Sequence, residues 1–497
     1  MKTFPVPPNV RFVGRERERA LLHSLSDRGE ATAVVVYGRR RVGKTELIEQ
    51  SFRRRGLLKF EGVQTPFSAK SKESKRIQID HVLHQLALYA EAPHIARLKY
   101  DSWMDVFALL NSFVEKGEVT LYFEEVQWLA HYEDEFFSEL KQVWDNHWRR
   151  NAGLILVLCG SSPSFIIHQL LSDKAFYNRA GFEIPLKPFN LLETQEFLGK
   201  DKSLSEALSA QLTCGGIPEY LKRLRARSSV YLSLCRESFL PGSFFSREKD
   251  RIFVSSLSAN RNFEKILDFL SRRAYATRDD LVRLTGSGSG GTLTKLLEEL
   301  SSCGFVDMYA PLQRPVGTIL HRYAVADPYL RFYYRFIHPL RKDIDRGDFE
   351  KDPQKPLSLD QFHKWLGFSF EYFCRENHRL IAHILGFSGV QYKSGAFFVR
   401  GASPDRRGFQ IDLMFDRADG VSTLCEIKHT EAPTDISVAD DVNRKWARAV
   451  SFLPALSKKT RQNVLISVAG ATPRLKESGV FSHIITLEDL FTKAHWA

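Results

Sequence analysis

Cysteine is scarce in this sequence, with six cysteines scattered singly among 497 residues. Because none of them forms a C-x-x-C pair, the sequence argues against a structural zinc site and favours reduced thiols. Long apolar runs are also missing, and the longest, residues 154–159, is far too short to cross a bilayer. Residues 1–8 lack the apolar segment of a secretory signal. We therefore expect a cytoplasmic protein without a membrane partner.

The length exceeds what one hydrophobic core supports, and it predicts about three domains. The composition, 43% hydrophobic and 26% charged, is that of an ordinary globular protein. A formal net charge of +12 makes nucleic acid a candidate partner. The charge alone decides little, since the arginines form local clusters that could equally face a nucleotide or solvent. These clusters lie at residues 15–19, 39–41 and 53–55.

The chain is organised around residues 33–45, a β-branched run that leads into the letters GRRRVGKT. They fit the phosphate-binding pattern G-x-x-x-x-G-K-[ST] at every fixed position. Glycines allow the backbone to wrap a phosphate, while loop amides and the following helix direct positive dipoles at it. Lys44 is expected to reach the β- and γ-phosphates, and the Thr45 hydroxyl to ligate Mg²⁺. The predicted nucleotide contacts are Gly38, Arg39, Arg40, Arg41, Val42, Gly43, Lys44 and Thr45.

A second apolar strand pattern, residues 119–123, ends in the adjacent acids Glu124 and Glu125. This is the position of a Walker B motif, in which the first acid holds Mg²⁺ and the second activates water. Glu124 stands where Asp is usual and is one methylene longer, which weakens the case for direct metal coordination. Glu125 keeps the position of the general base. The alternative is that both glutamates only cap a helix that starts at Val126.

Residues 12–16, with the letters FVGRE, resemble the start of AAA+ and related signal-transduction ATPases. In those proteins the apolar pair, here Phe12 and Val13, lies near the adenine. Ser161 follows a third apolar strand and resembles the sensor-1 residue that faces the γ-phosphate. Arg179 stands where related ATPases carry an arginine at a subunit or domain boundary. It is a candidate γ-phosphate contact, and a solvated loop arginine is the alternative.

In chain order, the segments FVGRE, GRRRVGKT, LYFEE, CGSS and GGIPEYL resemble one family. It is the group of predicted archaeal-type ATPases, which belongs to the signal-transduction ATPases related to AAA+ and also occurs in bacteria. The resemblance extends over the whole chain, because later segments of the family are recognisable too. It implies ATP and Mg²⁺ as cofactors and a helical lid after the ATPase core. It also allows a homo-oligomer and an activating protein as partners.

The middle of the chain is predicted to form a winged helix. Thr277 and Asp280 form a capping box, and the glycine-rich residues 286–291 turn the chain. The predicted helices cover 263–271, about 278–284 and 292–300, and the predicted strands cover 304–309 and 318–323.

The third of these helices carries Glu298 and Glu299 beside Lys295, a poor face for a phosphate backbone. A packing or relay module is therefore favoured over a DNA-reading one. The aromatic residues 327–336 resemble the linker of the family, which is expected to pack between domains.

A further domain is predicted after the polar residues 352–357. Glu371 lies on a helix expected to run to about residue 384, and Asp412 lies on a following strand. Glu426 and Lys428 form an E-x-K pattern on the next strand, where the period of two places both side chains on one face.

This order resembles the core of PD-(D/E)XK nucleases, with Ile411 in place of the proline before the acid. The resemblance implies that Asp412 and Glu426 share Mg²⁺, with Mn²⁺ as a further candidate. Lys428 would orient water or stabilise phosphate charge, and Glu371 would contribute from the helix. Bound metal would polarise the phosphodiester. Loss of cleavage with retention of the fold is the alternative.

The sequence thus predicts an α/β protein: a P-loop parallel sheet with a helical lid, a winged helix and a C-terminal α/β restriction-endonuclease-like domain. The expected function is ATP hydrolysis coupled to a metal-dependent nuclease that acts on nucleic acid, with DNA favoured and defence against foreign DNA as the setting. The alternative is a nucleotide-dependent switch or DNA-binding regulator whose C-terminal domain is a docking surface. The expected domains are 1–190, 191–255, 256–345 and 346–497.

Overall fold

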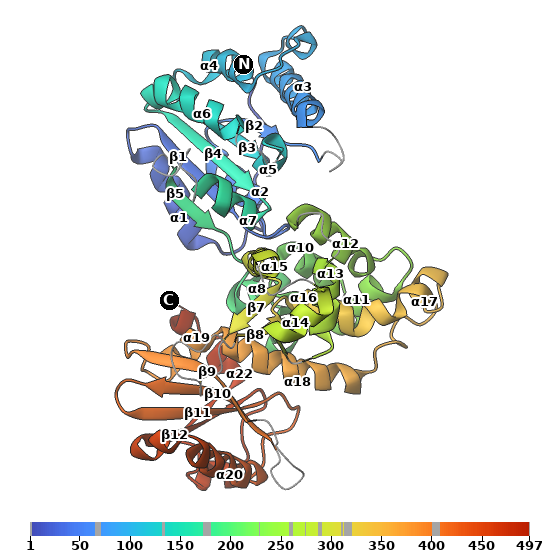
Figure 1. Ribbon diagram of the computed structural model, residues 1–497, viewed down its shortest axis with the longest axis vertical. Helices are drawn as coiled ribbons and strands as arrows, with labels where there is room; N and C mark the ends of the chain where they lie inside the picture. Colours follow the sequence, from blue (N-terminus) through green and yellow to red (C-terminus); the bar gives the residue numbers. More distant parts are fainter. Residues whose placement is uncertain are drawn as a thin grey trace.

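The residues that the structure describes build three β-sheets that follow one another in the sequence, each with its own helices (Figure 1). The computed structural model describes residues 2–64, 71–131, 135–171, 180–227, 229–257, 262–273, 275–286, 291–309, 312, 321–399 and 408–496. No helix among these residues combines the length and the apolar character that crossing a membrane requires.

The first sheet has five strands in the order β2-β3-β4-β1-β5, and all of its pairings are parallel. Its central strands are buried on both faces, as continuous apolar runs in parallel sheets require. The predicted strands at 33–37, 119–123 and 154–159 are confirmed. The bounds are β1 Thr32–Tyr37, β2 Gly56–Glu61, β3 Val119–Glu124, β4 Leu154–Gly160 and β5 Ala180–Pro185.

Helices cover both faces of this sheet. Val34 and Val36 of β1 pack on the side of α1 and α2, while Ala33 and Val35 pack on the side of α3, α4 and α6. The latter side holds a cluster of aromatic rings around Phe107. The bounds are α1 Glu16–Ser24, α2 Lys44–Phe52, α3 Ser71–Ala90, α4 Trp103–Val114, α5 Val126–Leu129, α6 Glu135–Asn146 and α7 Pro163–Phe165.

A helical segment follows the first sheet and forms the predicted lid. Asn190 begins it with a capping box, in which its side chain accepts from the Glu193 amide and the Glu193 carboxylate accepts from the Asn190 amide. Two more helices of this segment begin at serine N-caps. The Ser203 side chain accepts a hydrogen bond from the Glu206 amide, and the Ser229 side chain accepts one from the Leu232 amide. The bounds are α8 Leu191–Leu198, α9 Leu204–Cys214, α10 Pro218–Arg225, α11 Val230–Phe239 and α12 Phe244–Ser256.

The middle segment contains three helices and a small antiparallel sheet in the order β6-β8-β7, the arrangement of a winged helix. The predicted capping box of Thr277 and Asp280 is confirmed. The predicted strand at 318–323 is seen in part as β8, while 318–320 lie outside the described residues. The bounds are α13 Asn262–Ser271, β6 Ala276–Thr277, α14 Arg278–Thr285, α15 Gly291–Ser302, β7 Val306–Tyr309 and β8 Arg322–Val325.

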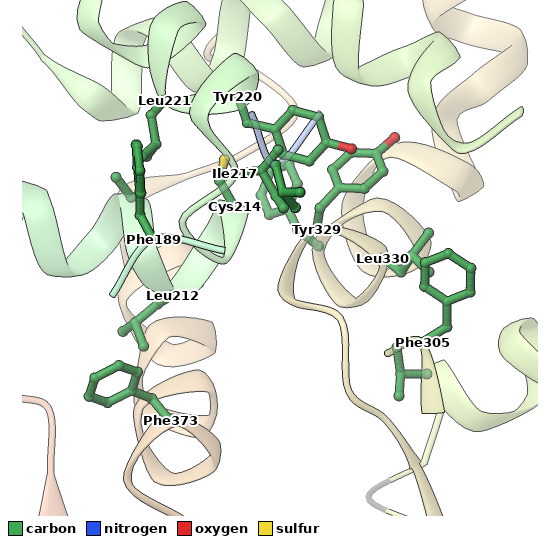
Figure 2. Packing of buried hydrophobic residues seen from close by; sticks show 14 of the residues in the cluster. Phe189, Leu212, Cys214, Ile217, Tyr220, Leu221, Phe305, Tyr329, Leu330 and Phe373 are labelled. Carbon is green, nitrogen blue, oxygen red and sulfur yellow. The ribbon is translucent and has the colours of Figure 1, made fainter. Parts of the chain in front are cut away.

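The predicted linker at 327–336 is buried and begins with a short helix, α16 (Pro328–Phe332). The helix α17 (Arg341–Arg346) follows it. Helix α9 of the lid contacts both α16 and α18, so the lid, the linker and the last domain share one core. Figure 2 shows this core, with Phe373 of α18 below lid residue Leu212 and with Tyr329 of α16 beside Tyr220.

The C-terminal sheet is mixed, in the order β13-β12-β11-β10-β9. Helix α18 covers one face, where Phe370 packs with Leu413 and Cys425, and α20 covers the other. The predicted single helix to residue 384 was wrong, because Asn377 separates α18 from α19. The bounds are α18 Leu359–Glu376, α19 His378–Ile384, β9 Tyr392–Val399, β10 Phe409–Arg417, β11 Val421–Lys428, α20 Ser437–Phe452, β12 Thr460–Ser467, α21 Pro473–Glu477, β13 His483–Ile485 and α22 Leu487–Leu490.

Gly216, in the turn between α9 and α10, is required by both its conformation and its surroundings. Its φ is +71°, and a Cβ atom there would lie 2.1 Å from the Phe189 carbonyl oxygen. We expect Gly216→Ala to destabilise the protein by about 1–2 kcal/mol from the left-handed backbone. Overpacking against the fixed carbonyl is expected to add roughly 1–3 kcal/mol.

Gly242→Ala is the matched control, because Gly242 has a φ of +67° and a Cβ atom there would meet nothing within 4 Å. Urea unfolding of both variants would measure the difference. Equal losses in the two variants would contradict the role of the close approach at Gly216.

Candidate nucleotide-binding and nuclease sites

The loop between β1 and α2 closes around the lysine side chain of the phosphate-binding pattern. Lys44 is buried, and its Nζ donates to the carbonyl oxygens of Gly38, at 2.9 Å, and Arg39, at 3.1 Å. Only glycine fits at position 38, since a Cβ atom would lie 2.3 Å from the Leu186 carbonyl oxygen. Val42 is buried beneath the loop. Lys44 is also the first residue of α2, so its ammonium group lies beside a helix N-terminus, an arrangement that suits a phosphate chain.

Glu124, at the end of β3, meets Thr45, at the start of α2. The Thr45 hydroxyl donates to one carboxylate oxygen of Glu124, and Lys59 Nζ lies 2.6 Å from the other. Burial alone would lower the pKa of Lys59, but the carboxylates of Glu124 and Glu49 raise it above its ordinary value. The longer Glu124 side chain therefore reaches the predicted Mg²⁺ ligand Thr45. Hard oxygen donors of this kind suit Mg²⁺.

Lys59 lies on β2, and sequence reasoning missed it. Nothing in its local pattern distinguishes it from an ordinary strand lysine, because its partners Glu49 and Glu124 come from a helix and from another strand.

Glu125 and Ser161 come together from the ends of β3 and β4. The Glu125 carboxylate accepts from the Ser161 amide, at 3.1 Å, and from the Ser161 hydroxyl, at 2.6 Å. Glu125 has a left-handed φ of 54° at the start of α5, a conformation that typically costs about 1–3 kcal/mol. Its carboxylate turns to Ser161 instead of the first amides of α5, so the helix-capping alternative does not describe its contacts.

The FVGRE segment lies against the loop and the lid. Arg15 is buried, its Nη2 donates to the Val42 carbonyl at 3.0 Å, and its guanidinium stands 4.6 Å from the Phe189 ring centroid. Phe12 and Val13 are half-buried at the edge of the same core. Their predicted place beside an adenine stays a prediction. Arg179 lies outside the described residues.

The loop arginines separate into two groups. The side chains of Arg39 and Arg41 form ion pairs with acids that follow the ATPase core, Asp327 at the start of α16 and Glu248 on α12. Arg40 is half-buried. The roles of all three as nucleotide contacts stay predictions.

In the C-terminal domain, the structure brings the four predicted site residues together. Glu371 projects from α18 toward the strand ends that carry Asp412, Glu426 and Lys428, and Asp412 and Glu426 are buried. The Asp412 carboxylate accepts from the Ile427 amide at 3.2 Å. The pairing of β10 with β9 is irregular between residues 411 and 414, so Asp412 lies at a bulge. Bulges re-aim side chains and are frequent beside active sites.

Two lysines hold Glu426. Lys428 Nζ and Lys445 Nζ each lie 2.7 Å from one of its carboxylate oxygens. Gln410 bridges the other acids, since its amide lies 3.5 Å from Glu371 Oε2 and 3.4 Å from Asp412 Oδ1. Lys445 and Gln410 were missed from the sequence. Lys445 lies on α20 and has an ordinary i,i+4 partner, Asp441, which hides its second contact.

The electrostatics of this site come from crowded acids. Burial and then the Asp412 carboxylate raise the pKa of Glu371 to about 7, and burial and then Glu426 raise the pKa of Asp412. The carboxylate oxygens are suitable donors for Mg²⁺ or Mn²⁺. Among the described residues, however, no group of three or more His, Cys, Asp or Glu side chains has the geometry to hold a metal ion.

Comparisons with known proteins agree with the first part of this description. Residues 12–224 match the family model of an ATPase domain predominantly from Archaea. An uncharacterized protein of Methanocaldococcus jannaschii is 24% identical over 366 residues, which cover 73% of this chain and 76% of that protein.

Among solved structures, the Walker-type ATPase of Pyrococcus abyssi has a TM-score of 0.50 at 18% identity, over 66% of this chain and 99% of that one. The ORC2 protein of Aeropyrum pernix has a TM-score of 0.40 at 16% identity, over 70% of this chain and 97% of that one. The Pyrococcus structure shows a shared fold, and the predicted archaeal-type ATPase domain is confirmed.

The Glu125–Ser161 contact generates a prediction for ATP turnover. If Glu125 is the general base, Glu125→Gln lowers the turnover rate by about 10²–10⁴-fold, while the dissociation constant for ATP stays within a few-fold. Release of inorganic phosphate and binding of a fluorescent ATP analogue would measure the two quantities.

Glu118→Gln is the control, because Glu118 is exposed and directly precedes β3, at the opposite end of the strand from Glu125. Turnover that survives in Glu125→Gln, or that falls equally in Glu118→Gln, would rule out the assigned role.

Proposed function

Residues 12–224 form an ATPase domain of the archaeal type, and from this premise we propose that ATP binding and hydrolysis control a metal-dependent nuclease-like domain acting on nucleic acid. The proposed division of the chain is an ATPase core at 1–190, a lid at 191–255, a winged helix with its linker at 256–345 and the nuclease-like domain at 346–497.

One observation carries the nuclease part of the proposal. Asp412, Glu426 and Lys428 converge on two neighbouring strands, and Glu371 reaches them from the helix that covers the sheet. An arrangement of two strand acids, a lysine and a helix acid suits phosphodiester hydrolysis. Bound Mg²⁺ or Mn²⁺ would supply Lewis acidity and a more acidic water.

The protein's own groups have distinct parts in this proposal. Asp412 and Glu426 would hold the metal, and Gln410 orients Asp412 with respect to Glu371. Lys428 is the more exposed of the two lysines beside Glu426, with 35% of its side chain accessible against 17% for Lys445. This greater exposure supports a role for Lys428 in contact with a phosphate or the attacking water, while Lys445 pairs with the other carboxylate oxygen of Glu426.

In the ATPase core, Thr45 and Glu124 would hold Mg²⁺, Lys44 would bind the phosphates and Glu125 would orient water. The net charge of +12 supports a nucleic-acid partner, with DNA favoured. A homo-oligomer, an activating protein and a role in defence against foreign DNA belong to the proposal by family resemblance.

A second function is favoured by the two ion pairs of Glu426. Lys428 and Lys445 both pair with this carboxylate, so its charge is compensated by side chains of the protein itself. In this reading the protein is a nucleotide-dependent switch or a DNA-binding regulator. A reading role for the winged helix is less favoured, because four leucines of α15 are buried and the helix contacts α7 of the ATPase core.

Cleavage assays test the proposal. Purified protein is incubated with plasmid, linear and single-stranded DNA and with RNA, in Mg²⁺ or Mn²⁺, with and without ATP. We expect cleavage that EDTA abolishes, that Lys428→Ala lowers by about 10²-fold or more, and that ATP or Lys44→Ala alters. Lys476→Ala, an exposed lysine of α21 in the same domain, is the control. ATP turnover without cleavage of any substrate would favour the docking surface instead.

A further inference from the structure

Two buried ion pairs join the phosphate-binding loop to the lid helix α12 and to the start of the linker helix α16. The Arg39 guanidinium pairs with Asp327, and their side chains are 9% and 2% accessible. Arg41 Nε lies 2.8 Å from Glu248 Oε1, and Glu248 is fully buried. Tyr220 connects the pairs, because its hydroxyl donates to Glu248 at 3.0 Å and accepts from Arg39 at 3.3 Å. We call these five residues the clasp.

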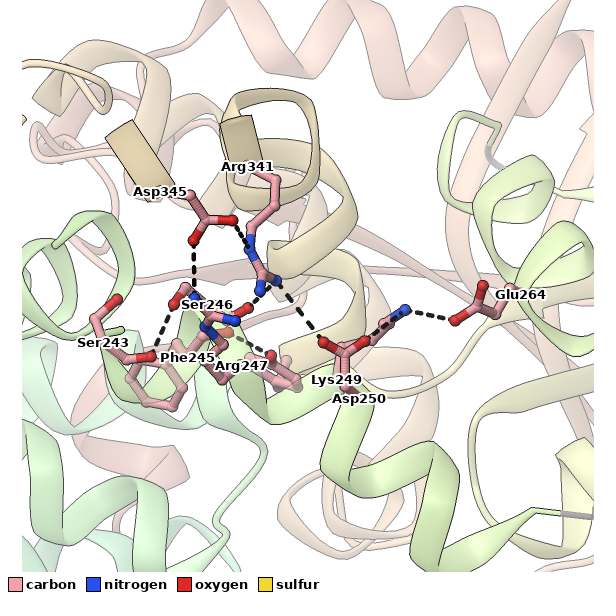
Figure 3. Close-up of polar contacts among 10 residues, drawn as sticks. Ser243, Phe245, Ser246, Arg247, Lys249, Asp250, Glu264, Arg341 and Asp345 are labelled. Atoms are coloured by element: carbon pink, nitrogen blue, oxygen red, sulfur yellow. Dashed lines mark hydrogen bonds and ion pairs between the residues drawn. The ribbon is translucent and has the colours of Figure 1, made fainter. Parts of the chain in front are cut away.

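The acids of the clasp belong to elements that are fixed independently of the loop. Glu248 lies on α12, whose other side chains bind α13 and α17 (Figure 3). Lys249 lies 2.6 Å from Glu264, and Arg247 lies 3.1 Å from Asp345. Asp327 is the N-cap of α16 and accepts from the Leu330 amide at 2.7 Å. Loss of the ion pair at Asp327 would therefore alter the side chain that caps the start of α16.

Helix α16 in turn touches the helix that carries Glu371. The Arg331 guanidinium stands 4.1 Å from the ring centroid of Tyr372, the neighbour of Glu371 on α18. Phe332 packs against Trp365, also on α18, at 5.5 Å between ring centroids. A contiguous set of contacts thus runs from the phosphate-binding loop through α16 to α18.

Arg39 and Arg41 lie within the segment whose backbone must wrap a triphosphate, and the Arg39 carbonyl itself accepts from Lys44 Nζ at 3.1 Å. A phosphate that binds Lys44 would compete with this carbonyl, and a shift of the loop backbone would move both guanidinium groups relative to Asp327 and Glu248. A ligand shifts an equilibrium only by its different affinity for the two states, and the two arrangements of the loop would differ in this way.

We propose that the clasp senses nucleotide: a bound nucleoside triphosphate draws Arg39 and Arg41 from Asp327 and Glu248, which releases α16 and, through it, α18. The effect on Glu371 rests on the proposed nuclease function, whereas the effect on α16 does not. Because nucleotide binding and opening of the clasp are linked, weakening the clasp must strengthen nucleotide binding.

Neutral isosteres of the acids test the clasp. Asp327→Asn keeps an N-cap side chain, and Glu248→Gln keeps an acceptor for Tyr220. We expect each variant to bind a non-hydrolysable ATP analogue with Mg²⁺ about 5-fold more tightly or better. Asp345→Asn is the matched control, because it removes an exposed acid that pairs with the same helix α12, and its affinity should equal that of the wild type. Unchanged or weaker binding in both folded clasp variants would overturn the proposal.

Amide hydrogen exchange of the unmodified protein provides an independent test that survives a folding defect in either variant. The analogue is expected to speed exchange in peptides covering α16 and α18 and to leave α4, on the far face of the first sheet, unchanged. Equal exchange of α16 with and without the analogue would overturn the clasp, as would a complete lack of nucleotide binding.

Cleavage measured on the same samples separates this proposal from the nuclease assignment. If nucleotide affinity and hydrogen exchange shift but no substrate is cleaved, the clasp proposal is supported and the nuclease assignment is contradicted. If substrate is cleaved but affinity and exchange do not shift, only the clasp proposal is contradicted.

Discussion

A carboxylate that leaves water must meet a cation or lose its charge, and this constraint determines how the parts of the protein are joined. Four buried acids each form an ion pair with a lysine or an arginine, whereas buried Asp412 instead accepts from the Ile427 amide. The pairs of Glu124, Asp327 and Glu248 join elements that lie far apart in the sequence. The pairs are Glu124 with Lys59, Asp327 with Arg39, Glu248 with Arg41, and Glu426 with Lys428 and Lys445.

The same constraint explains the different character of the two candidate sites. At the first, Glu124 has one lysine, and its remaining partner is the hydroxyl of Thr45, so the acid stays close to the phosphate-binding loop. At the second, two lysines hold one acid while Glu371 and Asp412 repel each other across Gln410. In the first arrangement an acid and a hydroxyl lie beside the phosphate-binding loop, and in the second two lysines compensate the charge of one of three crowded acids.

Much of the fold was predictable, because these elements depend on residues close together in the sequence. The β-branched run before Gly38, the apolar strand before Glu124 and the Thr277 capping box all specify short-range structure, and the structure contains each of them. The contacts of Lys59, Lys445 and Arg39 could not be predicted in this way. Their partners lie on other elements, and for Arg39 the partner is nearly three hundred positions away. The break at Asn377 was missed because apolar spacing continues across it.

The six cysteines are all buried as thiols, and burial raises the pKa of each above its ordinary value. The thiolate is the form that reacts with alkylating reagents, so these buried thiols should remain unmodified while the fold is intact. Thiol-reactive probes are therefore expected to leave the natural cysteines of the native protein unlabelled. A single cysteine placed on the surface of α17 and another on α20 could carry a pair of fluorophores, and the distance between the domains could be followed without first removing any natural cysteine.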